Sequence, residues 1–173
     1  MRLAIVLLVM LAAGCSVTAH TGRHQASSSS SGWWPSPTLA AGGGWTTTTA
    51  SSLGITTTVA STVPLRDAPS DIPAGTLRSL PAAGIVVVAS GWLEQSPPPP
   101  LPLAKPRPMP YQLTQFRHDR GWEGQPAANV PQYVLFTSLD AHLLDVRVFF
   151  GTQHPSDDQV KRAQAELDTL SWG

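Results

Sequence analysis

The feature that most constrains the fold is an apolar, β-branched run bounded by glycines. Residues 84–92 read Gly-Ile-Val-Val-Val-Ala-Ser-Gly-Trp and carry no charge. β-Branched side chains favour extended backbone, and an apolar run without polar alternation is typical of a strand buried on both faces. The sequence therefore predicts a central strand here, around which a sheet has to be built.

Two further segments have strand character. Residues 132–137 form a second apolar stretch, and Leu143 to Phe150 alternates with a period of two. In the alternating segment one face is predicted to be core and the other, which carries Asp145 and Arg147, to be wetter. The core face would consist of Leu144, Val146, Val148 and Phe150. Residues 138–141 suit a tight turn between the two strands, and residues 111–118 give a weaker strand signal.

A helix is predicted after the last strand. Ser156 is suited to be the N-cap, and Gln159 completes a capping box three residues later. An apolar stripe at helical spacing should lie on the sheet, and Trp172 should pin the helix end. The stripe consists of Val160, Ala163, Leu167 and Leu170. For residues 63–173 we therefore expect a small α+β domain, with three to four antiparallel strands and the C-terminal helix packed on one face.

The N-terminus predicts export. Residues 1–2 are a short positive region, and residues 3–13 are an apolar run too short to span a bilayer, which is typical of a signal peptide. The run ends in Leu-Ala-Ala-Gly-Cys at residues 11–15, which resembles the lipobox of bacterial lipoproteins. The resemblance implies a signal peptide over residues 1–14, cleavage after Gly14 and a diacylglycerol thioether on Cys15.

Two alternatives remain for Cys15. Val17-Thr18-Ala19 resembles an ordinary signal-peptidase site, and cleavage there would remove Cys15 and release a secreted protein. Cys15 could also be an apolar residue of the signal peptide with no further role. The lipobox interpretation places the protein on the extracytoplasmic side of the cell membrane, held there by its lipid anchor.

Residues 15–62 are rich in Ser, Thr and Gly and have almost no charge. Such a segment has little apolar surface to bury against the entropy of ordering it, so we predict a disordered linker between the anchor and the domain. A second unusual segment, residues 96–110, carries clustered prolines that favour polyproline II. It would be either a stiff connection between strands or a docking segment for an aromatic groove.

Charge and motifs exclude several functions. Eleven basic and eleven acidic residues give a net charge of zero without a basic run, which argues against nucleic acid as a partner. The chain has no GxSxG, HExxH or CxxC motif, and we predict no catalytic, cofactor-binding or metal site. Five His and Asp side chains could in principle bind a metal, but they are better explained as exposed polar residues. These candidates are His118, Asp119, His142, Asp145 and His154.

Residues 122–126, the last strand and the helix resemble domains in uncharacterised exported proteins of high-GC actinobacteria. That resemblance implies no activity and no ligand. We expect a non-catalytic binding or assembly module of the cell envelope, whose partner would be an envelope protein or a glycan. The alternatives are a carrier of an apolar ligand and an accessory cell-wall enzyme. An enzyme would have to use acids near aromatic loop positions, namely Glu94, Asp119 and Glu123.

Overall fold

The computed structural model describes residues 36–52, 54–66, 72–92, 105–119, 130–139 and 142–173. These residues form mostly β structure with two α-helices and one 3₁₀ helix. The strands are β1 (Pro37–Thr38), β2 (Thr46–Ser52), β3 (Ile55–Ser61), β4 (Ile85–Trp92), β5 (Arg117–Asp119), β6 (Gln132–Leu139), β7 (His142–Phe150) and β8 (Ser171–Trp172). The helices are α1 (Ala74–Arg78), η1 (Leu113–Gln115) and α2 (Asp157–Leu167).

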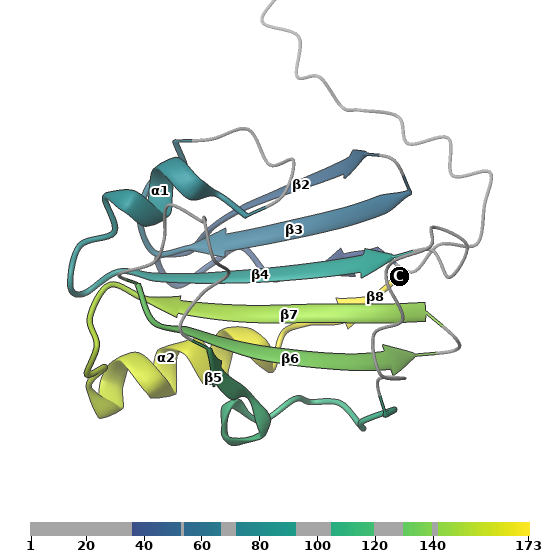
Figure 1. The fold of residues 1–173 in the computed structure, drawn as a ribbon. Helices are drawn as coiled ribbons and strands as arrows, with labels where there is room; N and C mark the ends of the chain where they lie inside the picture. Colours follow the sequence, from purple (N-terminus) through teal and green to yellow (C-terminus); the bar gives the residue numbers. More distant parts are fainter. Residues whose placement is uncertain (1–35, 53, 67–71, 93–104, 120–129, 140–141) are drawn as a thin grey trace, which may run out of the picture. The chain divides into compact units, whose positions relative to one another are not determined.

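Six strands make one antiparallel sheet in the order β2-β3-β4-β7-β6-β5 (Figure 1). The two central strands, β4 and β7, pair over their full common length, from Ile85 opposite Phe150 to Trp92 opposite Leu143. Both strands bury side chains on both faces of the sheet, as the uninterrupted apolar run of β4 requires. A separate ribbon joins β1 to β8, which lie far apart in the sequence.

One face of the sheet, the helix face, is covered by α2. Ala163, Leu167 and Leu170 are buried there against alternate residues of the central strands, such as Val87 and Val148. The segment before β5 covers the same face, with Tyr111, Leu113 and Phe116 buried in the same cluster. The side chain of Gln164 holds this segment to α2, because it accepts a hydrogen bond from the Leu113 amide at 2.8 Å and donates one to the Tyr111 carbonyl at 3.0 Å.

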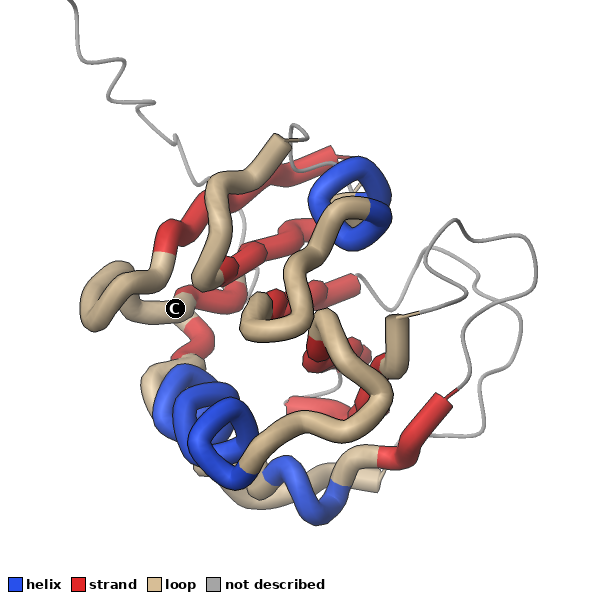
Figure 2. The backbone as a smooth tube through the Cα atoms, turned by 90° about the vertical axis from the view of Figure 1, so that its left-hand side faces the viewer, coloured by secondary structure: helices blue, strands red, loops and turns tan. Residues whose placement is uncertain are grey.

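The opposite face, the second face, is covered at one end by α1 and its flanking loops (Figure 2). Leu77 of α1 is fully buried against Val59, Val86, Val88 and Phe149. Glycines allow the chain to turn closely at this end. The Gly151 amide donates to the Gly84 carbonyl at 3.0 Å, and a Cβ on Gly151 would lie 1.8 Å from the Pro81 carbonyl oxygen. Only glycine fits at residue 151 without a shift of the backbone.

The predicted fold class is wrong. The sheet has six strands rather than three to four, a second two-stranded sheet is present, and α2 is the only helix of seven or more residues in the described part of the chain. The fold is therefore mostly β. The main error lies in residues 15–62, which were predicted to be a disordered linker but contribute β1, β2 and β3.

The physical reason is the threonine content of these strands. Thr is β-branched and favours extended backbone, although it adds little apolar surface. Its hydroxyls pair across the strands, with Thr49 and Thr58 at 2.8 Å and Thr57 and Ser90 at 2.9 Å. Strand β3 thereby buries polar residues together with Val59 and Ala60 against β4.

Several individual elements were predicted correctly. Strands form over residues 85–92, 132–139 and 142–150, close to the predicted ranges. Ser156 is the N-cap of α2, where its hydroxyl accepts from the Gln159 amide at 3.3 Å and the Gln159 side chain accepts from the Ser156 amide at 3.0 Å. In the weak segment 111–118 only residues 117–118 belong to a strand, because residues 113–115 form η1.

Candidate functional site

The two outer edges of the six-stranded sheet differ in length and charge. One edge is β5, which has three residues and exposes Arg117. The other is β2, whose seven residues, Thr-Thr-Thr-Thr-Ala-Ser-Ser, include no charge and no proline. Natural sheets usually protect their edges by short strands, charges, prolines or bulges, because unpaired backbone groups invite another strand. β5 has two of these protections, its short length and its charge, whereas β2 has none of them.

Strand β2 is held in a regular hairpin with β3. Seven consecutive residue pairs run without a bulge from Thr46 opposite Ser61 to Ser52 opposite Ile55. Only two residues lie between Ser52 and Ile55, and the second, Gly54, has a positive φ of 80°, which glycine adopts without a steric penalty. The hydroxyls of Ser51 and Thr56 add a cross-strand contact at 3.0 Å on the helix face.

The hairpin geometry decides which backbone groups of β2 point away from the sheet. In a two-residue hairpin the closing residues, Ser52 and Ile55, exchange both of their N–H···O bonds, and hydrogen-bonded pairs then alternate along the strands. Residues 46, 48, 50 and 52 therefore bond to β3. The N–H and C=O groups of Thr47, Thr49 and Ser51 point outward, and no described strand pairs with that side of β2.

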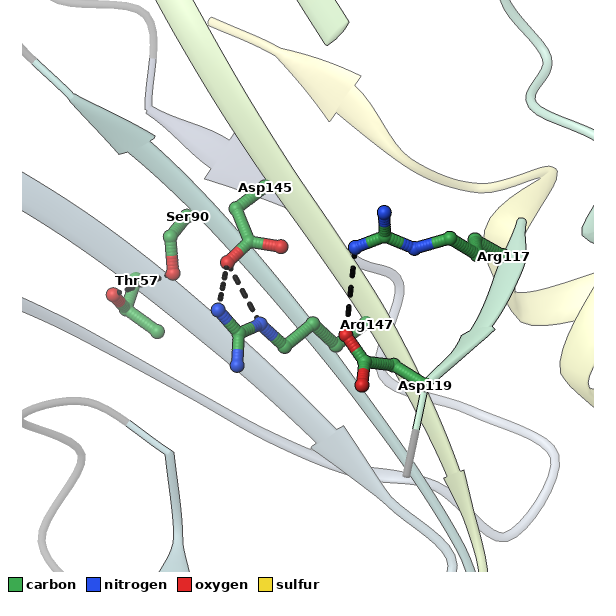
Figure 3. Close-up of polar contacts among 6 residues, drawn as sticks. All are labelled: Thr57, Ser90, Arg117, Asp119, Asp145 and Arg147. Atoms are coloured by element: carbon green, nitrogen blue, oxygen red, sulfur yellow. Dashed lines mark hydrogen bonds and ion pairs between the residues drawn. The ribbon is translucent and has the colours of Figure 1, made fainter. Parts of the chain in front are cut away.

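A second polar feature lies inside the sheet, on the second face. Thr57, Ser90 and Asp145 are neighbours across β3, β4 and β7 in consecutive register pairs. Arg147, two residues along β7 from Asp145, turns its guanidinium toward this carboxylate (Figure 3), with Nε at 2.7 Å and Nη2 at 2.6 Å from Oδ2. Both residues are buried, with 4% of Asp145 and 8% of Arg147 exposed. The prediction that they lie on a wetter face is therefore wrong.

Two close contacts hold these inner polar groups together, the Asp145–Arg147 ion pair and the hydroxyl pair of Thr57 and Ser90. A buried ion pair of this kind offsets much of its desolvation cost through close contact, and removing one partner leaves an uncompensated charge. Thr57 and Ser90 similarly share one hydroxyl–hydroxyl hydrogen bond. We therefore interpret this cluster as part of the sheet's internal structure.

Glu166 is a buried acid with a perturbed environment. It lies on α2 and is 4% exposed, and its buried Oε1 atom accepts no hydrogen bond from the described residues. Burial raises the pKa of its carboxyl from 4.5 to about 7. The burial of Glu166 was not predicted from the sequence, because the helical apolar pattern marks only its neighbours Ala163 and Leu167 as core residues. Neither ion pair among the described residues includes Glu166.

The residues considered for a metal do not come together. No group of three or more His, Cys, Asp or Glu side chains that could hold a metal ion occurs within the described residues. His118 contacts the ring of Tyr133 at a centroid distance of 5.2 Å, and Asp119 forms an ion pair with Arg117 at 3.5 Å. These contacts give His118 and Asp119 structural partners on β5 and β6.

Several predicted features lie outside the described residues. Cys15 and the whole signal peptide are among them, as are Glu94, Glu123 and the first part of the proline-rich segment. Of that segment, the structure describes residues 105–110, where the Lys105 carbonyl accepts a hydrogen bond from the Thr137 hydroxyl at 3.1 Å. Among the helices that the structure does describe, none has the length and apolar character to cross a membrane.

Comparison with protein-family models, with curated proteins and with solved structures found no match for this chain. No relative therefore adds a residue role to the geometry given above, and the outer edge of β2 is the candidate site.

Proposed function

We propose that the protein is a lipid-anchored module of the bacterial cell envelope that binds a protein partner by adding a strand to β2. The observation that supports binding is the outer side of β2, with three N–H and three C=O groups directed away from the sheet at Thr47, Thr49 and Ser51. Strand addition gives affinity through backbone hydrogen bonds and needs no catalytic residue. The lipobox-like sequence ending at Cys15 supports the anchored location.

The rest of the fold suits β2 for this role. The hairpin of β2 and β3 is fixed to the core through β3, whose Val59 and Ala60 are fully buried. A rigid edge lowers the entropy cost of binding, because the receiving strand is already extended and in place. The side chains of β2 are small hydroxyl or methyl groups, so they do not obstruct an incoming strand on either face.

Hydrogen exchange at single-residue level tests the binding proposal. The protein is labelled in intact envelopes and, in parallel, as a purified sample at high dilution. The amides of Thr48, Ala50 and Ser52 bond to β3 and should exchange slowly in both samples, which makes them an internal control. The amides of Thr47, Thr49 and Ser51 should exchange slowly only in the envelope. Equal and fast exchange of these three amides in both samples would refute strand addition.

The anchor has a separate test. Replacing Cys15 by Ser removes the only thiol of the chain and should move the protein from the membrane fraction to the medium. Unchanged partitioning would refute lipidation, and it would leave the strand-addition proposal to be decided by hydrogen exchange.

A further inference from the structure

The outer edge of β2 can pair with a second copy of itself. We infer that the strand that adds to β2 is β2 of a second copy of this chain, in an antiparallel pair whose two-fold axis passes beside Thr49. This inference rests on the proposed function, because it names the occupant of the same edge. It would join two six-stranded sheets into one continuous sheet of two copies.

The outward backbone groups match themselves under this two-fold axis. An antiparallel pair centred on Thr49 places Thr49 opposite Thr49 of the other copy, and Thr47 opposite Ser51 on each side. These three residues are the ones whose N–H and C=O groups point away from β3. All six groups of each copy would therefore find partners, without a shift of register and without a bulge.

The side chains also match. Thr46 would face Ser52, and Thr48 would face Ala50, so every cross-strand pair consists of small uncharged residues. Opposed Thr and Ser residues can continue the hydroxyl pairing that already links Thr49 to Thr58 and Ser51 to Thr56. The chain has a net charge of zero, so two copies do not repel one another at long range.

A cysteine placed at the axis tests the inference in the full chain. The Cys15→Ser background removes the native thiol, so that Thr49→Cys carries a single one. Hydrogen-bonded antiparallel partners have Cα atoms about 5.5 Å apart, within the range that a disulfide spans. Thr46→Cys is the matched control, because its two copies would lie roughly 20 Å apart at about 3.4 Å per residue. We expect a disulfide-linked dimer as the main oxidised species of Thr49→Cys and only monomer for Thr46→Cys.

A pair of substitutions at residue 49 tests the backbone bonds. Thr49→Pro removes an N–H that points outward, which an edge strand tolerates, whereas Thr49→Ala keeps that N–H. Both variants lose the hydroxyl contact with Thr58. In sedimentation at increasing concentration, Thr49→Ala should double its apparent mass and Thr49→Pro should stay monomeric. If Thr49→Pro does not fold, Thr49→Lys replaces it, because two like charges would then face each other at the axis.

The outcomes separate this inference from the proposed function. Monomer for Thr49→Cys, or equal crosslinking at residues 46 and 49, overturns self-pairing. If the outward amides are nevertheless protected in the envelope, the edge binds a different protein, and the proposed function stands without self-pairing. If those amides are already protected in the dilute monomer, a segment of the same chain occupies the edge, and both proposals are wrong.

Discussion

Replacing Glu166 by Gln should raise the stability of the protein at high pH, by an amount relative to the wild type that grows between pH 4.5 and 8. Glu166 is 4% exposed on α2, and burial raises its pKa from the ordinary value of 4.5 to about 7. The carboxyl is therefore still protonated in the folded protein at pH values where it is ionised in the unfolded chain. Gln keeps the shape of the side chain and carries no charge.

The sign and the size follow from proton linkage. Between pH 4.5 and about 7 the unfolded chain binds fewer protons at this residue than the folded protein does, so the free energy of unfolding falls as the pH rises. Above the pKa of the folded state, the loss of unfolding free energy caused by Glu166 no longer changes with pH. The difference between the two pKa values corresponds to roughly 3 kcal/mol. The wild type should lose about this amount relative to Glu166→Gln between pH 4 and pH 8.

Urea unfolding at a series of pH values measures this effect. The free energy of unfolding of the variant minus that of the wild type should rise by roughly 3 kcal/mol from pH 4 to pH 8, while contributions of other titrating groups cancel in the difference. Asp158→Asn is the matched control, because Asp158 is an exposed acid on the same helix. A difference that stays constant across the pH range would show that Glu166 is solvated and that its burial has no electrostatic consequence.

Three further substitutions test the packing of the sheet and its helix. Asp145→Asn should lower the free energy of unfolding by about 3–5 kcal/mol, because Arg147 would remain buried after losing the carboxylate that lies 2.6 Å from it. The double change Asp145→Leu with Arg147→Met should recover most of this loss in urea unfolding, and equal losses for both variants would contradict the ion-pair argument. Gly151→Ala should cost about 1–3 kcal/mol or more, since its Cβ would meet the Pro81 carbonyl, whereas Gly42→Ala, with open space around it, should cost almost nothing. Ser156→Ala should cost about 1 kcal/mol by loss of the N-cap bond to Gln159, and an unchanged melting temperature would show that this bond adds no stability.

The sequence predicted the elements whose patterns are local and strong. The apolar run at residues 85–92 and the capping box of α2 are examples, because burial on both faces and N-cap chemistry each leave a clear residue pattern. The number of strands was not predictable in the same way. Strands β2 and β3 have the composition of a linker. β3 becomes a strand by pairing with β4, a partner more than twenty residues away, and β2 in turn pairs with β3.

The candidate site was missed for a related reason. Residues 46–52 match no catalytic or ligand-binding motif, so the sequence alone gives no reason to select them as a site. Their significance lies in backbone groups left at a sheet edge, and the edge is defined only once the strand order is known. For Asp145 and Arg147 the face of the strand was predicted correctly, but their burial was not. Alternation assigned them correctly to the face opposite Val146 and Val148, but alternation alone does not reveal that the opposite face is buried too.

The short ribbon of β1 and β8 has a consequence for the order of folding. Its hydrogen bonds include a reciprocal backbone pair between Ser36 and Gly173, and the hydroxyls of Thr38 and Ser171, 133 residues apart, meet at 2.7 Å. Closing a flexible loop of that length costs about 4 kcal/mol by chain entropy, which two strands of two residues cannot offset on their own. The ribbon therefore forms only after the sheet and α2 have brought its two strands together, and it is the first part of the fold to open. In native-state hydrogen exchange, the Ser36 and Gly173 amides should exchange through local opening of low free energy, whereas the amides of β4 and β7 should exchange only through global unfolding.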